Sequence, residues 1–236
     1  MTWFQSHIGL SILLGIAGIF CILGLYYGFK PSRVNISSIP NPARNYEQAL
    51  ARIDVIKEYE ASLPELNPDC ETIFLSHGNS VDNVVVFLHG FTTCPQQFRK
   101  LGEEFYLRGC NVYIPRIPKH GFKDRLGTAL TDLTSEELVE FATHSLDIAQ
   151  GLGRKVTVSG LSGGGVLAVW LAQERADVDV AVPISPSLGI SFIPAQLSRF
   201  FIKLISIIPN FFMWWDPVSK ENNPLSSDYQ YVRYPI

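Results

Sequence analysis

The sequence predicts an α/β fold, with a mostly parallel sheet and helices on both of its faces, preceded by one transmembrane helix. Short β-rich runs alternate with helical runs from about residue 71 to residue 188, and this alternation is typical of a parallel sheet. Within it, a glycine-rich turn at residues 160–164 leads directly from a β-rich run into a helical one. Near the N-terminus, Ile8 to Tyr27 carries no charged residue.

The uncharged stretch is long enough to cross a bilayer as a helix. The aromatic residues Trp3 and Phe4 precede it and Tyr26 and Tyr27 close it, an arrangement that resembles the aromatic belts of membrane interfaces. No Lys or Arg precedes the stretch and no small-residue cleavage site follows it, so an uncleaved anchor is favoured over a signal peptide. We therefore expect an anchor in residues 1–30, followed by a Pro-, Ser- and Asn-rich linker in residues 31–45.

The side of the membrane is left open. Lys30, Arg33 and Arg44 follow the apolar stretch, which favours a cytoplasmic position for the rest of the chain. Outside that stretch, Cys70, Cys94 and Cys110 form an odd set without the spacing of a disulfide framework or a metal site, in line with the same side. A glycosylation sequon begins at Asn35, but so short a pattern decides little.

The main domain is expected over residues 46–190. Apolar periodicity predicts helices at Tyr46–Leu63, Pro95–Leu107 and Gly163–Gln173, and a capping box formed by Thr134 and Glu137 predicts one that runs to about Gln150. Strands are predicted where short apolar or β-branched runs occur, at Glu71–Ser76, Val84–Leu88, Asn111–Ile117, Lys155–Ser159 and Val178–Ile184.

The turn between the fourth strand and its helix reads Gly160-Leu161-Ser162-Gly163-Gly164, a G-x-S-x-G run. Such a sharp turn strains the backbone of its serine, and only residues without a side chain fit where strand and helix nearly touch. Gly160 and Gly164 supply those positions. Ser162 is therefore the candidate nucleophile, and the alternative is an ordinary loop serine.

A second loop begins with His89, Gly90 and Phe91, directly after a buried strand. Through the G-x-S-x-G turn and this loop, the sequence resembles the α/β-hydrolase superfamily, and within it serine esterases and monoacylglycerol-lipase-type carboxylesterases. The resemblance covers about Glu71 to Leu188. It implies that Ser162 attacks an ester carbonyl, that the backbone amides of Phe91 and Gly163 form the oxyanion hole, and that His89 and Gly90 shape the loop.

The sequence departs from this family in its triad. The family's acid and histidine follow the nucleophile, in the order Ser, Asp or Glu, His, whereas all five histidines here precede Ser162, namely His7, His77, His89, His120 and His144. We expect a sheet that is incomplete at its C-terminal end and a chain that is a fragment of an active enzyme. The alternatives are a catalytically silent relative, used as a scaffold or ligand-binding membrane protein, or an enzyme with an improvised base. His120 is the candidate for such a base, although a loop residue at the substrate entrance is the favoured interpretation.

Residues 191–236 are expected to form a cap-like segment, because Ile193 to Trp215 is dense in Phe, Ile, Leu and Trp. A lid over an acyl pocket predicts an acyl or lipid ester as the substrate. Packing against the sheet, or a place in the bilayer interface, would explain the same composition. Asp216 and Asp228 follow this stretch, but no strand precedes either of them, so neither is a favoured triad acid.

Other function classes find little support. The net charge is −3 with no basic patch, so nucleic-acid binding is not expected. The chain has no phosphate-binding glycine loop and no Cys/His cluster, so neither a cofactor nor a metal is expected. Peptidase, thioesterase and haloperoxidase chemistry stay open, because they share the same turn and differ in the pocket. The oligomeric state is not predicted.

Overall fold

The chain is seen in a computed structural model that describes residues 39–189, 193–205, 210–222 and 227–236, with single positions between 14 and 28. These residues fall into two compact units. The larger unit runs from residue 36 to residue 188 and includes residues 210–236. The smaller unit combines residues before 36 with residues 189–209.

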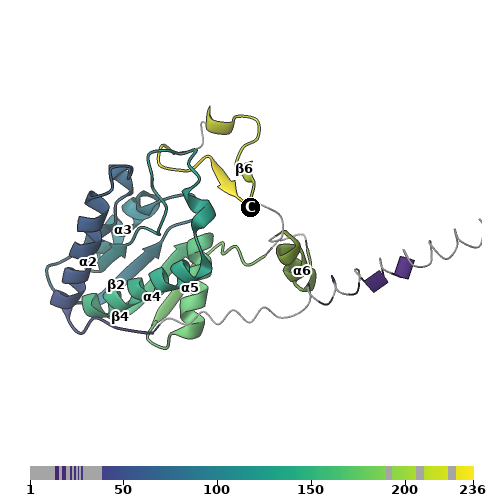
Figure 1. Cartoon of the computed structure of the whole chain (residues 1–236). Coiled ribbons are helices and arrows are strands. Elements are labelled where there is room, and N and C mark those ends of the chain that lie inside the picture. The colour runs from purple at the N-terminus through teal and green to yellow at the C-terminus, as the bar shows by residue number, and fades with distance from the viewer. Residues whose placement is uncertain are drawn as a thin grey trace, which may run out of the picture. The chain divides into compact units, whose positions relative to one another are not determined.

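Five strands form the central sheet of the larger unit, in the order β1-β3-β2-β4-β5 (Figure 1). Their bounds are β1 Ile73–Leu75, β2 Val81–Leu88, β3 Asn111–Ile114, β4 Gly153–Leu161 and β5 Val180–Ile184. β1 runs antiparallel to β3, and all other neighbours are parallel. The predicted mostly parallel sheet is confirmed.

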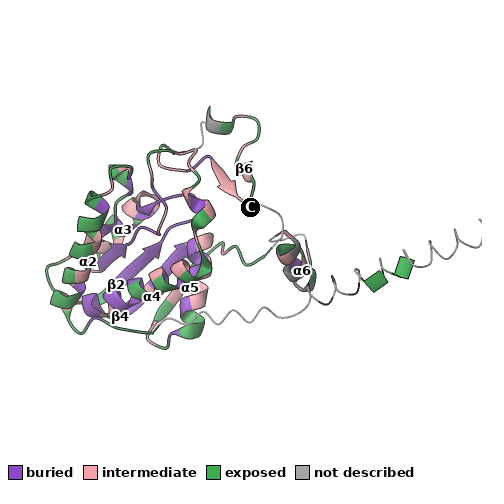
Figure 2. Ribbon diagram, viewed as in Figure 1, coloured by how far each residue is buried: buried purple, intermediate pink, exposed green. Residues whose placement is uncertain are grey.

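Helices cover both faces of this sheet. They are α2 Tyr46–Ala61, α3 Arg99–Leu107, α4 Ser135–Leu152 and α5 Gly163–Glu174. On β2, Val84 and Val86 lie in one core with residues of α2, α4 and α5. Val85 and Phe87 lie in a second core, together with Phe105 of α3. Figure 2 shows β2 and β4 buried between the layers, which explains why the β2 sequence is apolar without alternation.

The start of α4 is fixed by the predicted capping box. The Thr134 hydroxyl accepts the Glu137 N–H at 3.2 Å, and the Glu137 carboxylate accepts the Thr134 N–H at 2.9 Å. Short 3-10 turns at Pro68–Cys70, Pro95–Phe98, Ala129–Asp132 and Lys220–Asn222 complete the helical segments. Most predicted elements are confirmed, with shifts of a few residues at their ends.

β5 forms an edge of the sheet and is poorly covered. Val180, Val182 and Ile184 are 49%, 42% and 36% exposed. They alternate along the strand, so they share one face. This face of the edge strand is therefore apolar and partly exposed, and the incompleteness of the sheet stays a prediction.

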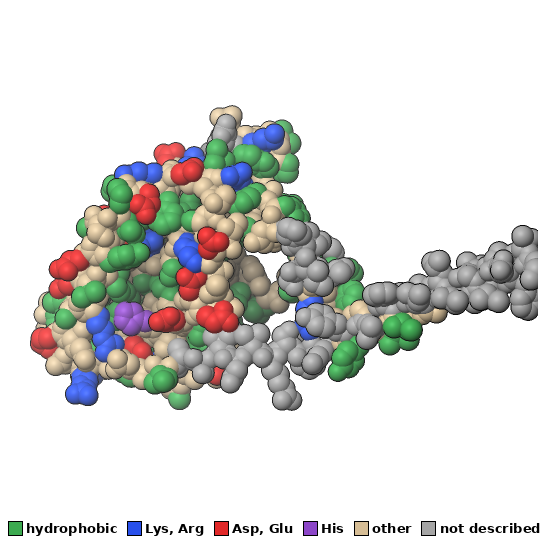
Figure 3. Space-filling view, in the orientation of Figure 1, with side chains coloured by type: hydrophobic (Ala, Val, Ile, Leu, Met, Phe, Trp, Pro, Cys, Tyr) green, Lys and Arg blue, Asp and Glu red, His purple; other side chains and the backbone are tan. Residues whose placement is uncertain are grey.

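The predicted cap segment is divided between the two units. In the smaller unit, α6 spans Ala195–Ile205. In the larger unit, β6 Phe212–Trp214 and β7 Arg233–Pro235 form a two-stranded antiparallel sheet. On the face drawn in Figure 3, acidic and basic side chains are interspersed among hydrophobic ones.

The predicted anchor lies mostly outside the described residues. Its described positions between residues 14 and 28 are helical. Over the part of the chain that the structure describes, no helix combines the length and the apolar character needed to cross a membrane. The anchor therefore stays a prediction.

The interpretation of the cysteines is wrong in one respect, because Cys70 and Cys94 form a disulfide with their Cα atoms 5.3 Å apart. Cys110 is a free cysteine. The 24-residue separation of the pair matches no familiar framework. The bond arises from the tertiary fold, which brings the turn before β1 against the loop after β2.

Candidate active site

Ser162 lies between the end of β4 and the start of α5, as the sequence predicts. Its backbone has φ 54° and ψ −110°, a region that residues other than glycine rarely occupy and that is associated with strain at functional sites. The Ser162 N–H donates to the Ile184 carbonyl of β5 at 3.0 Å. The serine is thus held on a sharp turn at the carboxyl edge of the parallel strands.

The flanking glycines are required by the close approach of strand and helix. A side chain at Gly160 would collide with the Gly164 carbonyl, and one at Gly164 would collide with the Leu88 carbonyl. At Gly165 an added Cβ would lie 3.0 Å from the Gly160 carbonyl oxygen. The steric reason for glycine that the sequence indicated is present in the structure.

A second serine, Ser187, contacts Ser162, and the sequence analysis did not identify it. The hydroxyls of Ser162 and Ser187 are 2.9 Å apart, and the Ser187 N–H points to the Ser162 carbonyl at 3.4 Å. Ser187 follows β5, the parallel neighbour of β4. Carboxyl ends of parallel strands share one edge of the sheet, and that rule could have identified Ser187 as a candidate.

The two predicted oxyanion donors are close to each other. A Cβ added at Gly163 would lie 3.4 Å from the Phe91 backbone nitrogen. Among the described hydrogen bonds, neither the Phe91 nor the Gly163 N–H has an acceptor. Gly163 is also the first residue of α5, where the N–H has no partner within the helix. Both N–H groups thus have no acceptor among the described hydrogen bonds, and their role as oxyanion donors stays a prediction.

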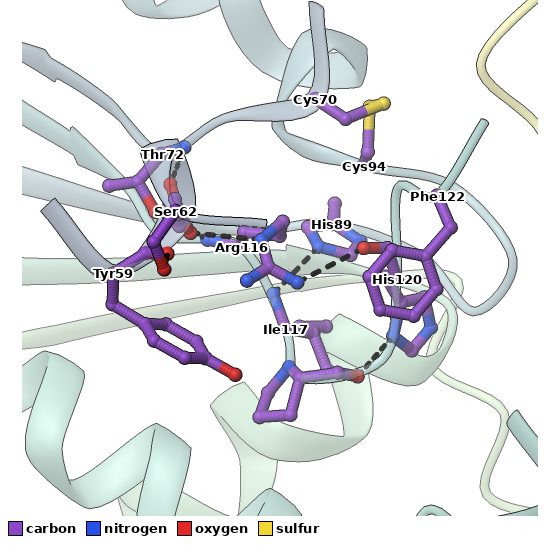
Figure 4. A network of polar contacts seen from close by, with 12 residues as sticks. Tyr59, Ser62, Cys70, Thr72, His89, Cys94, Arg116, Ile117, His120 and Phe122 are labelled. Atoms are coloured by element: carbon purple, nitrogen blue, oxygen red, sulfur yellow. Dashed lines mark hydrogen bonds and ion pairs between the residues drawn. A yellow bond between two sulfur atoms is a disulfide. The ribbon is translucent and has the colours of Figure 1, made fainter. Parts of the chain in front are cut away.

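His89 is fully buried and bridges two loops (Figure 4). Its Nε2 accepts the Ile117 N–H at 3.0 Å, and its Nδ1 lies 3.0 Å from the Gly90 carbonyl. The first bond requires a bare Nε2, so Nδ1 carries the proton and donates to Gly90. Burial, followed by the neighbouring His120, holds the pKa of His89 well below its usual value. His89 is therefore a neutral side chain that connects the two loops, and its role in aiming the Phe91 amide stays a prediction.

The structure places His120 away from any exposed rim, because its ring is fully buried. Its centroid lies 5.2 Å from that of His89 and 5.7 Å from that of Phe91. Nδ1 is 2.8 Å from the Pro118 carbonyl, whereas the buried Nε2 has no partner. Burial lowers the pKa of His120 to about 4. The ring thus lies in the interior, in contact with Phe91, and its part in shaping the substrate entrance stays a prediction.

The loop that carries His120 is supported by a buried ion pair that sequence reasoning missed. Arg116 Nε lies 2.9 Å from a carboxylate oxygen of Glu60, and both side chains are almost fully buried. Arg116 also donates to the His120 carbonyl at 3.1 Å. The same carboxylate accepts the N–H and the hydroxyl of Thr72 at 2.7 and 2.9 Å. Figure 4 shows this network next to the disulfide. The network connects the loop of His120 to α2 through Glu60, and to Thr72 directly before β1.

No described histidine is placed as the base for Ser162. His89 bonds to backbone groups of its own loop and of the loop after β3, His120 bonds to the Pro118 carbonyl of its own loop, and His77 lies 3.2 Å from the Tyr106 carbonyl. His144 is on α4, and His7 lies outside the described residues. Asp216 accepts the N–H groups of Val218 and Ser219 in its own turn. Within the described ranges, no cluster of His, Cys, Asp and Glu could hold a metal ion.

The parallel sheet and the serine turn after β4 are the arrangement expected of an alpha/beta hydrolase. A family model described as the alpha/beta hydrolase family matches residues 85–231, which is more than half of the chain. The protein belongs to the alpha/beta hydrolase family. The resemblance expected from the sequence is thereby confirmed.

Individual relatives are lipases and esterases. The chain is 30% identical over 120 residues to a thermostable monoacylglycerol lipase of Bacillus sp. (strain H-257), covering 48% of this chain and 44% of that lipase. A monoacylglycerol lipase structure from Paleococcus ferrophilus is 20% identical, with a TM-score of 0.43, over 69% of this chain and 64% of that one. An esterase structure from Pyrococcus furiosus is 18% identical, with a TM-score of 0.40, over 72% and 69%. The chain thus spans less than half of the length of the curated relative it matches.

Proposed function

We infer that this protein is a membrane-anchored serine hydrolase of the esterase and lipase type, in which Ser162 is the nucleophile. The left-handed backbone of Ser162 between its two required glycines carries this proposal. A fold that served only as a scaffold would gain nothing from such a turn, because the strain lowers stability. The rest of the proposed mechanism follows from the groups around this serine.

In the proposed reaction, Ser162 Oγ bonds to the acyl carbon and the carbonyl oxygen becomes an oxyanion. The N–H groups of Phe91 and Gly163 stabilise that oxyanion. The alcohol then leaves with a proton, and water releases the acid from the acyl enzyme. The proton of Ser162 passes to a general base outside the described contacts. Before the attack, the Ser187 hydroxyl lies 2.9 Å from the Ser162 hydroxyl and holds it in place.

The proposed substrate is an acyl ester, and a monoacylglycerol is the first choice because the curated relative is a monoacylglycerol lipase. The smaller unit supports an apolar substrate. On α6, Leu197 and Ile202 are 41% and 52% exposed, as a lid or an interfacial helix would require. An anchor formed by residues 8–27 would keep the enzyme beside a lipid substrate.

Labelling with a fluorophosphonate probe tests the nucleophile. We expect the natural full-length protein to be labelled, Ser162→Ala to lose the label completely, and Ser135→Ala, an exposed serine on α4, to retain it. Peptide mapping of the adduct must locate it at Ser162. Label at another residue, or no label on folded wild-type protein, would remove the basis for this mechanism.

A non-catalytic hydrolase-fold protein is the second candidate, favoured by one observation. None of the four described histidines hydrogen bonds to Ser162. The intact mass of the protein from its own cell separates the two candidates. A mass well above the 26.4 kDa of this chain, with peptides beyond Ile236, would supply room for the acid and the base. A mass equal to that of this chain, together with absent labelling, would favour the non-catalytic function.

A further inference from the structure

The loop after β2, residues 89–94, carries the proposed oxyanion donor Phe91, and its next residue has an unusual backbone. Thr92 has φ 73° and is 1% exposed. A positive φ is a genuine outlier for a β-branched residue. Strain of this kind persists only where surrounding contacts hold the residue in place.

Those contacts come from residues more than a hundred positions away. The Tyr231 N–H donates to the Thr92 carbonyl at 2.8 Å. The indole N–H of Trp215 donates to the Thr92 hydroxyl at 3.0 Å. The carbonyl and the hydroxyl of Thr92 are therefore both bonded to residues 210–236. This segment belongs to the larger unit.

Tyr231 also reaches the neighbouring loop. Its hydroxyl accepts the Phe122 N–H at 3.1 Å and donates to the Lys119 carbonyl at 3.2 Å. The residue is only 4% exposed. Its main chain thus holds the loop of Phe91 while its side chain holds the loop of His120, so both loops keep a fixed position relative to the C-terminal segment.

Trp215 and Tyr231 support one another through the small sheet. The Trp215 N–H donates to the Val232 carbonyl at 3.2 Å, and the Trp215 ring lies 4.3 Å from that of Tyr234. Arg233 of β7 donates to the Leu126 carbonyl from Nε at 3.0 Å. Packing and a backbone hydrogen bond therefore hold Trp215 in position independently of its contact with Thr92.

We propose that Trp215 and Tyr231 are positioning residues for the oxyanion hole, because they hold Thr92 in its left-handed conformation and thereby aim the Phe91 N–H at the site beside Ser162. This inference rests on the proposed function, since an oxyanion hole has a purpose only in acyl transfer. Neither residue touches the substrate in this role. Loss of the contact frees Thr92 to relax to a negative φ, which turns the Phe91 peptide away.

Trp215→Phe is the sharpest test, because it keeps an aromatic ring for the packing against Tyr234 and removes the indole N–H together with the five-membered part of the indole. Trp214→Phe is the matched control, since it makes the same change one residue earlier, in a side chain that faces Lys220. With the full-length protein and p-nitrophenyl butyrate, we expect Trp215→Phe to lower kcat about five-fold, the size of one ordinary hydrogen bond, because the Phe91 N–H is displaced and not removed. KM should stay unchanged, because the oxyanion forms only after binding. Trp214→Phe should retain wild-type kcat.

Hydrogen exchange of residues 89–94 provides a readout that does not depend on catalysis. Exchange in this loop should rise in Trp215→Phe, while exchange in β2 and in Trp214→Phe stays at the wild-type level. Unchanged loop exchange, or raised exchange with wild-type kcat in an active enzyme, overturns the positioning role. A wild-type protein that is inert to both ester and fluorophosphonate overturns the proposed function, and with it the purpose assigned to the two residues. That failure is visible in wild type alone and is distinct from a failure of the variant.

Discussion

The serine turn and the loop that faces it are fixed in different ways. At the turn, the conformation follows from neighbours in the sequence, because Gly160 and Gly164 let β4 and α5 come together around Ser162. The loop of Phe91 is held by residues that are distant in the sequence, through the disulfide at Cys94 and a hydrogen bond from the Tyr231 N–H. Steric exclusion thus shapes one half of the proposed site, and tertiary bonds shape the other. Substitutions in the two halves should therefore differ in how far they lower stability and in which conditions restore it.

The largest expected effect is that of Gly164→Ala in the turn. The added Cβ collides with the Leu88 carbonyl, and backbone cannot rotate away as a flexible side chain would. We expect the free energy of unfolding to fall by at least about 3 kcal/mol, the upper end of overpacking costs. Urea denaturation followed by circular dichroism measures this change.

Gly189→Ala is the control for that substitution. Its Cβ would meet the Ser198 hydroxyl at 3.8 Å, an ordinary contact. Its urea midpoint should equal that of the wild type. A Gly164→Ala protein with wild-type stability would mean that strand and helix are not in close contact at the turn.

The disulfide should have the second largest effect, and it concerns the facing loop. Closing a loop of 24 residues stabilises a protein by about 3 kcal/mol in the chain-entropy description. Reductant should therefore lower the urea midpoint of wild type. The Cys70→Ser, Cys94→Ser double variant should have the lower midpoint with or without reductant.

Cys110→Ser serves as the control, because Cys110 is a free thiol. This variant should keep the response of the wild type to reductant. A wild-type midpoint that does not depend on reductant would contradict the structural role of the bond. Loop exchange at residues 89–94 should rise on reduction, while exchange at the serine turn should not.

Acidification should have the smallest effect, and it again acts on the loop side. Burial lowers the pKa of His120 from 6.5 to about 4. Between these pH values the imidazole is protonated in the unfolded chain and neutral in the folded chain. Stability is then present above pH 6.5 and is lost as the pH falls toward 4. From pH 7 to pH 5 the expected loss is about 2 kcal/mol.

Urea denaturation at several pH values measures this dependence, and His120→Asn should flatten it. His89, whose pKa is lowered by burial and by His120, titrates in the same direction and leaves a residual slope. A variant that retains the full wild-type slope would show that the pH dependence has another source.

The same contrast explains which features the sequence could predict. The order of strands and helices, the capping box of α4 and the glycines of the turn are local patterns, and the structure contains them all. Ser187, the Glu60–Arg116 ion pair and the Cys70–Cys94 bond join positions 24 to 56 residues apart. No periodicity encodes such contacts. The interior position of His120 was missed for the same reason, because burial of a loop depends on what packs over it.

The disulfide has a consequence for where this domain folds. Disulfides persist in oxidising compartments such as the endoplasmic reticulum lumen, the bacterial periplasm or the cell exterior, and they are rare in the cytosol. The bond between Cys70 and Cys94 therefore favours maturation of the domain in such a compartment. The basic residues after the apolar stretch predict the opposite side. We expect alkylation of the protein from its own cell, with and without prior reduction, to show these two thiols protected.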